Sequence, residues 1–286
     1  MTRKKGFTLI ELLVVIAITS LLLSIIVPAV KMAKRKAAMA VCLTNVKNLS
    51  LAWYSYQGEN DGRFMSASPT ASDAQAPWVK HPIREDGTPC LPTSTNPPVT
   101  DDDEKRGIAK GKMYEYGVDN FDTYHCPGDT YRKSKYDGTT IFRSYAIPSA
   151  LGSGITRFHQ ITSPSSRYNF VEEGEGRNFN FGAWEFYTPW DSFNEFREWY
   201  WRDPISINHG SSGIIGFCDG HAEIHVWQDS DTKARLDFYF SNPSITDYGF
   251  GGNALNTAFA PFRTPGQNND TQYMGRGWAI QSPTRK

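Results

Sequence analysis

The sequence KKGFTLIE at residues 4–11 decides the fold, because it leads directly into an apolar stretch that ends at Val30. An α-helix rises about 1.5 Å per residue, so about 20 apolar residues cross the ~30 Å hydrocarbon core of a bilayer. Glu11 is the only ionisable side chain within this stretch, and an unpaired carboxylate in hydrocarbon costs several kcal/mol. The segment is therefore predicted to be a membrane-spanning helix whose acid requires a partner.

A partner arises if the chain is cut after Gly6, because the cut creates a new α-amino group on Phe7, close to the depth of Glu11. Within one helix this amine points along the axis. The better salt bridge therefore joins the Phe7 amine of one chain to Glu11 of a neighbouring chain. The same helix would then serve both as a membrane anchor and as an assembly element.

Two simpler interpretations explain less. A secretory signal peptide has an apolar region of about 7 to 15 residues that ends at a small-residue cleavage site, whereas this apolar run is longer and no such site closes it. A plain signal anchor tolerates any residue at positions 6, 7 and 11. It leaves the Gly-Phe pair and the acid unexplained.

On these residues the chain resembles the type IV prepilin family, which includes the pseudopilins of type II secretion systems. Gly6 to Glu11 match the family's processing motif, and Pro28 falls where many members carry a helix-bending proline. The resemblance implies that a prepilin peptidase cuts after Gly6 and methylates Phe7, and that Glu11 registers each subunit in a helical filament. It also implies a single-pass protein of the bacterial inner membrane, with its head in the periplasm or on a cell-surface filament.

Charge adds little about partners. Basic residues both precede the span, at 3–5, and follow it, at 31–36, so the count of positive charges does not fix its orientation. The second cluster is expected to lie among anionic lipid headgroups before assembly. The net charge is zero, and binding of nucleic acid is not expected. The resemblance names the partners instead: prepilin peptidase, other copies or related pilins in a filament, and the inner-membrane assembly machinery.

The helix is predicted to continue beyond the membrane, to about Gln57. Apolar residues recur every three or four positions, at Met39, Leu43, Val46, Leu49, Trp53 and Tyr56. We expect a leader at 1–6, a transmembrane and assembly helix at 7–30, its amphipathic continuation at 31–58, a globular head at 59–235 and an irregular C-terminal extension at 236–286. The predicted fold class is α+β and pilin-like, with the long helix packed on an antiparallel β-sheet head that carries long loops.

Residues 205–227 predict three short strands joined by a Gly-Ser-Ser-Gly turn and an Asp-Gly turn, and thus an antiparallel sheet. His209 and the pair Asp219 and Gly220 resemble the His-x9-Asp-Gly motif of a prepilin subgroup. We expect His209 and Asp219 to meet across the hairpin in a structural hydrogen bond, in preference to a metal-binding or catalytic role. His221 and His225 would lie about 13 Å apart along one strand, too far to share an ion.

Four cysteines allow three complete pairings, and an even count outside the cytoplasm usually indicates disulfides. Cys42 and Cys126 both lie in segments that resemble the subgroup, so the resemblance favours a disulfide between them. Cys90 with Cys126 is the alternative, and Cys218 fits a buried free thiol. No cofactor is predicted. Calcium, which secretion pseudopilins bind in a loop, stays open without a location, because the acidic run 101–104 is better explained as a solvated loop.

Two functions remain. The first is a structural subunit of a type IV pilus or a type II secretion pseudopilus. The second is a membrane-tethered or filament-tip binding protein, in which the aromatic-rich segment 184–201 recognises a polysaccharide or a surface. An enzyme is not expected, because no nucleophile lies beside a base. The sequence leaves open whether the subunit is major or minor and what cargo or adhesion target it serves.

Overall fold

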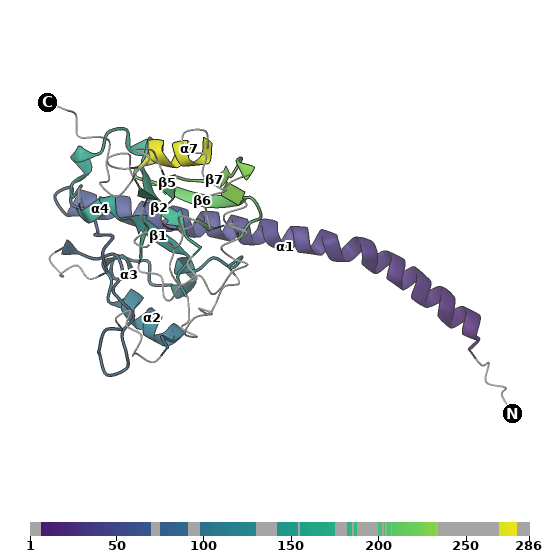
Figure 1. Ribbon diagram of the computed structural model, residues 1–286. Coiled ribbons are helices and arrows are strands. Elements are labelled where there is room, and N and C mark those ends of the chain that lie inside the picture. Colours follow the sequence, from purple (N-terminus) through teal and green to yellow (C-terminus); the bar gives the residue numbers. More distant parts are fainter. Residues whose placement is uncertain are drawn as a thin grey trace, which may run out of the picture.

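The computed structural model describes residues 7–69, 75–90, 98–129, 142–153, 155–174, 182–184, 186–187, 200–201, 203, 205–206, 208–230, 232–233 and 269–278. A single long helix, α1 (Leu9–Glu59), forms the N-terminal part of the chain. Its first half projects away from the head, and its second half lies across the head (Figure 1). This layout confirms the predicted α+β, pilin-like fold class.

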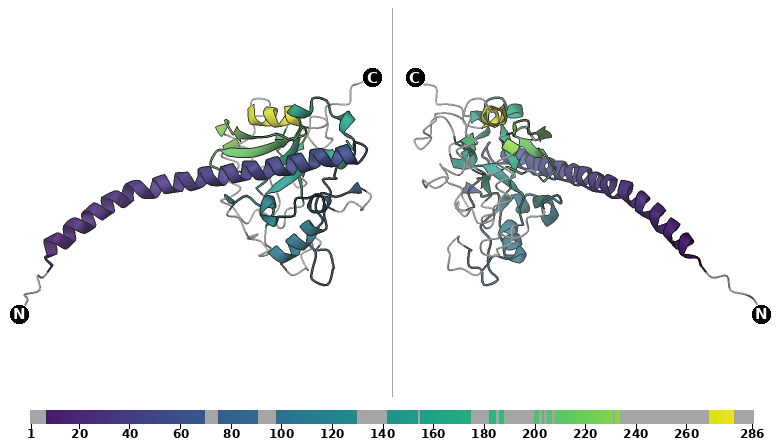
Figure 2. Two further views of the ribbon diagram at one scale, coloured as in Figure 1. Left: turned by 180° about the vertical axis from the view of Figure 1, so that it is seen from behind. Right: turned by 45° about the vertical axis from the view of Figure 1, so that its right-hand side comes forward.

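Helix α1 is continuous over 51 residues and contains Pro28 in its interior. The predicted extent of this helix is confirmed to within two residues at each end. Figure 2 shows that the free half curves along its length as it leaves the head. The predicted apolar face is also confirmed, since Val46, Leu49 and Trp53 are fully buried against the head.

The head is built on a five-stranded sheet in the order β3-β1-β2-β6-β7. Neighbouring strands are antiparallel except for the parallel pair β1 and β3. The strands are β1 (Tyr145–Pro148), β2 (Tyr168–Glu172), β3 (Ala183–Trp184), β6 (Ser212–Phe217) and β7 (Ala222–Val226), and β4 (Phe186–Tyr187) pairs with β5 (Tyr200–Trp201) in a separate sheet.

Two of the three strands predicted for residues 205–227 are present, as β6 and β7. The first is not a strand in the described residues, because Ile205 forms only an isolated bridge to Glu173. That bridge still brings the segment before His209 alongside the end of β2. This position, rather than a hairpin, determines what His209 can contact.

Helix α1 approaches the sheet closely at Gly216 of β6. A Cβ atom at this position would press on Ser50 Oγ and lie 2.8 Å from Asn169 Oδ1 and 3.0 Å from Val46 Cγ1. Ser50 Oγ in turn donates a 2.9 Å hydrogen bond to Asn169 Oδ1 of β2. The absence of a side chain at Gly216 therefore allows the helix and the sheet to share this polar contact.

The prediction of a solvated acidic loop is wrong, because residues 101–104 form the first turn of helix α2 (Asp101–Ala109). Thr100 and Asp103 form a capping box, which satisfies two backbone donors at the helix start. The Asp103 carboxylate also accepts 2.7 Å bonds from Arg84 and Arg106. Acids are favoured here because the helix dipole stabilises negative charge at the N-terminus.

The C-terminal extension is not irregular throughout, so that prediction is wrong for its described part. Residues 269–277 form helix α7 (Asn269–Gly277), which packs on the head (Figure 1). The Tyr168 hydroxyl donates a 2.8 Å hydrogen bond to the Tyr273 carbonyl, and Asp270 accepts from the backbone N–H of Gln228 at 3.0 Å. Further helices of the described residues are α3 (Lys112–Glu115), η2 (Phe121–Tyr124), α4 (Ala150–Ser153), η3 (Phe158–Gln160) and η4 (Pro164–Ser166), among others.

Substitution of Gly216 by alanine should lower the free energy of unfolding by about 1–3 kcal/mol, because the added methyl group overpacks the contact between α1 and β6. Denaturant unfolding of the full chain in detergent micelles, followed by circular dichroism, measures this change. Gly58→Ala is the control, since no atom lies within 4 Å of a Cβ built at this helical position. Equal stability of Gly216→Ala and wild type would contradict the close approach.

Glu104 should make stability depend on pH. Its carboxylate accepts the Phe142 N–H at 2.9 Å, and burial raises its pKa from 4.5 to about 7 despite the nearby Arg143. Between these values the folded chain keeps a proton that the unfolded chain has released. The free energy of unfolding should therefore fall as the pH rises from about 4.5 to about 7.

Glu104→Gln removes this titration, so urea unfolding across the same pH range should show a smaller fall for the variant than for wild type. Glu115→Gln changes an exposed carboxylate of α3 and should keep the wild-type profile. If the free energy of unfolding fell equally with pH in wild type and in Glu104→Gln, Glu104 would not be the source of the pH dependence.

Candidate functional sites: the N-terminal segment and a buried cysteine-histidine cluster

The start of α1 is organised by Thr8 and Glu11. Thr8 Oγ1 accepts the Glu11 N–H at 3.2 Å, and Glu11 Oε2 accepts both the N–H and the hydroxyl of Thr8 at 2.8 Å. This is a capping box, in which residues three apart satisfy each other's backbone donors. Glu11 is therefore held at the first turn of the helix by its own chain.

The free half of α1 is apolar and uncovered. Every residue from Phe7 to Val30 is exposed, with Phe7 at 72% and Val30 at 45% of their full accessible surface. Among the described residues, α1 is the one helix long and apolar enough to cross a membrane. A contiguous apolar surface of this size requires lipid or other protein to cover it.

In the head, the expected hydrogen bond between His209 and Asp219 is wrong. Asp219 Oδ1 instead contacts Nδ1 of His221 at 2.5 Å, within the turn that joins β6 and β7. Gly220 completes this turn with φ of +93°, a conformation that favours glycine. His209 points inward, because its segment runs beside the end of β2.

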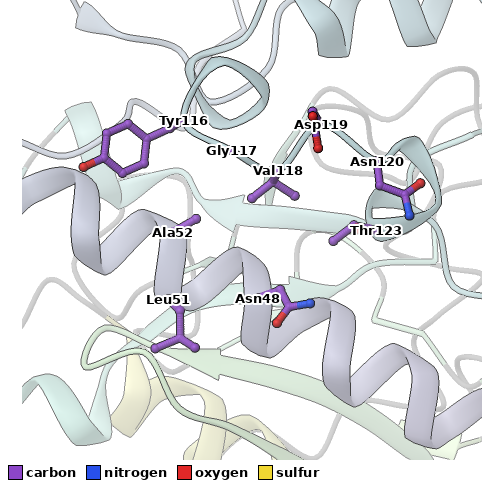
Figure 3. A pocket seen from close by; sticks show the side chains of 9 residues that line it. All are labelled: Asn48, Leu51, Ala52, Tyr116, Gly117, Val118, Asp119, Asn120 and Thr123. Carbon is purple, nitrogen blue, oxygen red and sulfur yellow. The ribbon is translucent and has the colours of Figure 1, made fainter.

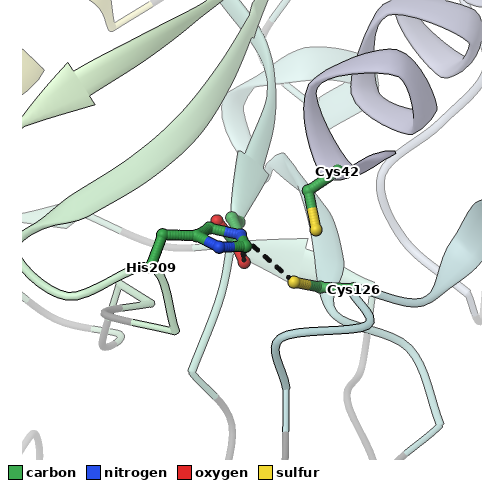
Figure 4. Close-up of side chains that lie close together, drawn as sticks. Cys42, Cys126 and His209 are labelled. Carbon is green, nitrogen blue, oxygen red and sulfur yellow. Dashed lines mark hydrogen bonds and ion pairs between the residues drawn. The ribbon is translucent and has the colours of Figure 1, made fainter. Parts of the chain in front are cut away.

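Four side chains from distant parts of the sequence meet where His209 points. They are Cys42 of α1, Cys126 after η2, Glu172 at the end of β2, and His209 before β6. One potential ligand atom from each lies within 4.8 Å of all the others. Figure 4 shows the side chains of Cys42, Cys126 and His209 pointing toward one another.

The cluster is buried and its contacts are short. His209 Nε2 lies 3.3 Å from Cys126 Sγ and 3.3 Å from Glu172 Oε1. The His209 side chain is 1% exposed and that of Glu172 is fully buried, and both cysteines are fully buried. The Gly128 N–H donates to Cys126 Sγ at 3.3 Å, and the Ile214 N–H donates to Glu172 Oε2 at 3.2 Å.

The members of the cluster change one another's pKa values. The hydrogen bond from Cys126 lowers the pKa of Cys42 to about 6 against the effect of burial, and the same bond raises the pKa of Cys126. Burial lowers the pKa of His209, but hydrogen bonds to Cys42 and Glu172 outweigh burial and raise it to about 10. The arrangement favours a Cys42 thiolate beside a His209 imidazolium.

The predicted disulfide between Cys42 and Cys126 is wrong in this structure, because all four cysteines are free thiols. The two residues are nevertheless neighbours in space, as the resemblance implied. Cys90 packs with Val99 in a separate small cluster, so it does not pair with Cys126. Cys218 is a buried free thiol, as expected, with Sγ 3.6 Å from the Tyr168 carbonyl oxygen.

Glu172 is the member of the cluster that sequence reasoning missed. It ends a strand in which all five residues are buried, from Tyr168 to Glu172. The available signal was an acid directly after the apolar pair Phe170 and Val171, because buried carboxylates are almost always paired.

Two other regions, a pocket and the aromatic segment, contain fewer groups that could bind a ligand or take part in a reaction. An open pocket lies between α1 and residues 116–123 (Figure 3), and Tyr116 and Asp119 are the only ionisable residues that line it. In the aromatic segment 184–201, Trp184 is fully buried and packs edge-on against Trp278 at 5.6 Å, so it belongs to the core. Residues 188–199 of that segment lie outside the described residues.

Comparison with known protein families finds a match at the N-terminus. Residues 1–27 match the family model described as the prokaryotic N-terminal methylation motif. The match contains Gly6, Phe7 and Glu11, so the chain carries a prepilin-type processing motif in front of its long helix. No curated protein and no solved structure matches the chain.

Proposed function

We propose that the chain is a structural subunit of a type IV pilus or a type II secretion pseudopilus. In this proposal a prepilin peptidase cuts after Gly6 and methylates Phe7, and α1 then assembles the subunit into a filament. The observation that carries the proposal is the methylation motif at residues 1–27 followed by a helix whose first half is uncovered. The His-x9-Asp-Gly segment supports, as a resemblance, membership of the corresponding prepilin subgroup.

The exposed half of α1 has two successive environments in this proposal. Before assembly it spans the inner membrane, where lipid covers its apolar side chains. After assembly the same surface packs against the helices of neighbouring subunits. The head stays outside the membrane in both states, in the periplasm or on the surface of the filament.

Glu11 is proposed to pair with the Phe7 amine of a neighbouring subunit. Among the residues that the structure describes, its carboxylate is hydrogen-bonded to Thr8 alone, through one oxygen, Oε2. A charge in an apolar filament core is tolerated only when an opposite charge compensates it. The capping box keeps the carboxylate at the helix start, where a new amine of a neighbour can reach it.

The mature protein, isolated from membranes of cells that contain a prepilin peptidase, should begin with N-methylated Phe7 and lack residues 1–6. Mass spectrometry of the N-terminal peptide measures this directly. Lys5→Gln is the control and should be processed normally, while Gly6→Val should block cleavage. A mature N-terminus at any other residue would refute the prepilin assignment.

Glu11→Ala and Glu11→Gln should both insert in the membrane and both be absent from filaments sheared from cells or purified from the envelope. Glutamine can keep the capping box, since it serves at this position of the motif, but it carries no charge. Quantitative immunoblotting of the filament and membrane fractions measures how much of each variant is in each fraction. Normal incorporation of Glu11→Gln would show that Glu11 acts through helix capping and would exclude the ion pair.

A further inference from the structure

We propose that Cys42, Cys126, Glu172 and His209 bind one zinc-class divalent metal ion that fastens α1 to the head. The inference concerns how the head is held on its helix and does not depend on the filament role. The four residues come from four separate segments, so a shared ion would cross-link the helix, the loop after η2, strand β2 and the segment before β6.

The types of ligand select the metal. Two thiolates, one imidazole and one carboxylate are donors that zinc accepts, usually in groups of four. Thiolates favour zinc and disfavour calcium and magnesium, which prefer oxygen ligands. The cluster therefore predicts a structural zinc site and argues against calcium at this position.

The distances agree with a tetrahedral site. Bond lengths of about 2.0–2.3 Å from zinc to N, O and S give ligand-to-ligand separations of about 3.3–3.8 Å in a tetrahedron. The structure places His209 Nε2 at 3.3 Å from both Cys126 Sγ and Glu172 Oε1. All four ligand atoms lie within 4.8 Å of one another, so small side-chain rotations complete the geometry.

Hydrogen bonding alone serves these atoms poorly. His209 Nε2 carries at most one proton, yet it faces both Cys126 Sγ and Glu172 Oε1 at the same distance. His209 is also the only member of the cluster that can carry positive charge beside two thiols and a carboxylate. A divalent cation among the four would balance the negative charge of two thiolates and a carboxylate and would bind all four donors.

The surroundings orient the donors toward a common centre. The Ile214 N–H holds Glu172 Oε2, which leaves Oε1 directed at His209. The Gly128 N–H donates to Cys126 Sγ and so restricts the orientation of that side chain. A Cβ at Gly128 would lie only 3.0 Å from His209 Cε1. Supporting contacts of this kind position the ligands in protein metal sites.

The location gives the ion a structural purpose. Cys42 is the first buried residue of α1 in chain order, because the residues from Phe7 to Val41 are exposed or half-buried. The proposed ion therefore lies where the helix enters the head. A metal bond at this point would prevent the end of the packed segment from separating from the loop of Cys126.

The first test is metal content. We would purify the full chain in detergent with a thiol reductant and without chelators. Inductively coupled plasma mass spectrometry should then find about one zinc ion per chain. Cys42→Ser and Cys126→Ser should each reduce zinc to below about 0.1 per chain. Cys90→Ser and Cys218→Ser are matched controls, since both thiols are buried, and each should keep the wild-type content. Zinc content unchanged by the Cys42 and Cys126 substitutions would overturn the proposal.

The second test starts from the wild-type chain, so its first readout does not depend on whether a variant folds well. Cobalt added to the metal-free wild-type chain should give the intense visible bands of a tetrahedral site and a near-ultraviolet thiolate-to-cobalt band. His209→Cys should retain the metal with a stronger thiolate band, whereas His209→Ala should lose it. Cobalt spectra without a thiolate band would overturn the proposal. So would a Cys42 to Cys126 disulfide in the native protein, trapped by alkylation during lysis, because it removes both thiolates.

Discussion

The contact between the second half of α1 and the sheet is the constraint on which the rest of the structure depends. One helix must satisfy two environments, since its first half is predominantly apolar and exposed on every side, while its second half is apolar on one face only. The sheet accepts that face through Gly216, whose missing side chain allows Ser50 to reach Asn169. This contact fixes the angle at which the free half leaves the head and the depth at which Cys42 lies.

Apolar packing alone would leave the position of α1 along its axis weakly defined, because helix and sheet can slide past each other with similar burial. Polar groups on the buried face define it. The Asn45 side chain donates to the carbonyl oxygens of Asp122 and His125 at 3.1 and 3.2 Å, and Ser50 donates to Asn169. A shift of one helical turn would leave these buried groups unsatisfied, at about 1–3 kcal/mol each.

The sequence predicts well those features that depend on neighbouring residues. The span, the helix beyond it and the buried positions Val46, Leu49 and Trp53 follow from a pattern that repeats within a few residues. The capping box at Thr100 and Asp103 also depends only on residues three apart, so the sequence contains it. The density of acids at 101–104 favours a solvated loop instead, which is why the helix is not predicted. The partner of His209 was not readable, because Asp219 is near in sequence whereas Glu172 is near only once β2 and β6 have paired.

Cys42 and Cys126 lie close together, as the resemblance implies, although they do not form the expected disulfide. Resemblance placed Cys42 and Cys126 together and assigned a disulfide, which needs only two residues. The structure retains the proximity but adds Glu172 and His209, two donors that a disulfide would not use. A buried carboxylate and imidazole are costly to retain beside a simple cross-link, because each loses its hydration. Their presence is accounted for by a centre that uses all four side chains, and the polar register along α1 then begins at Cys42, continues at Asn45 and ends at Ser50.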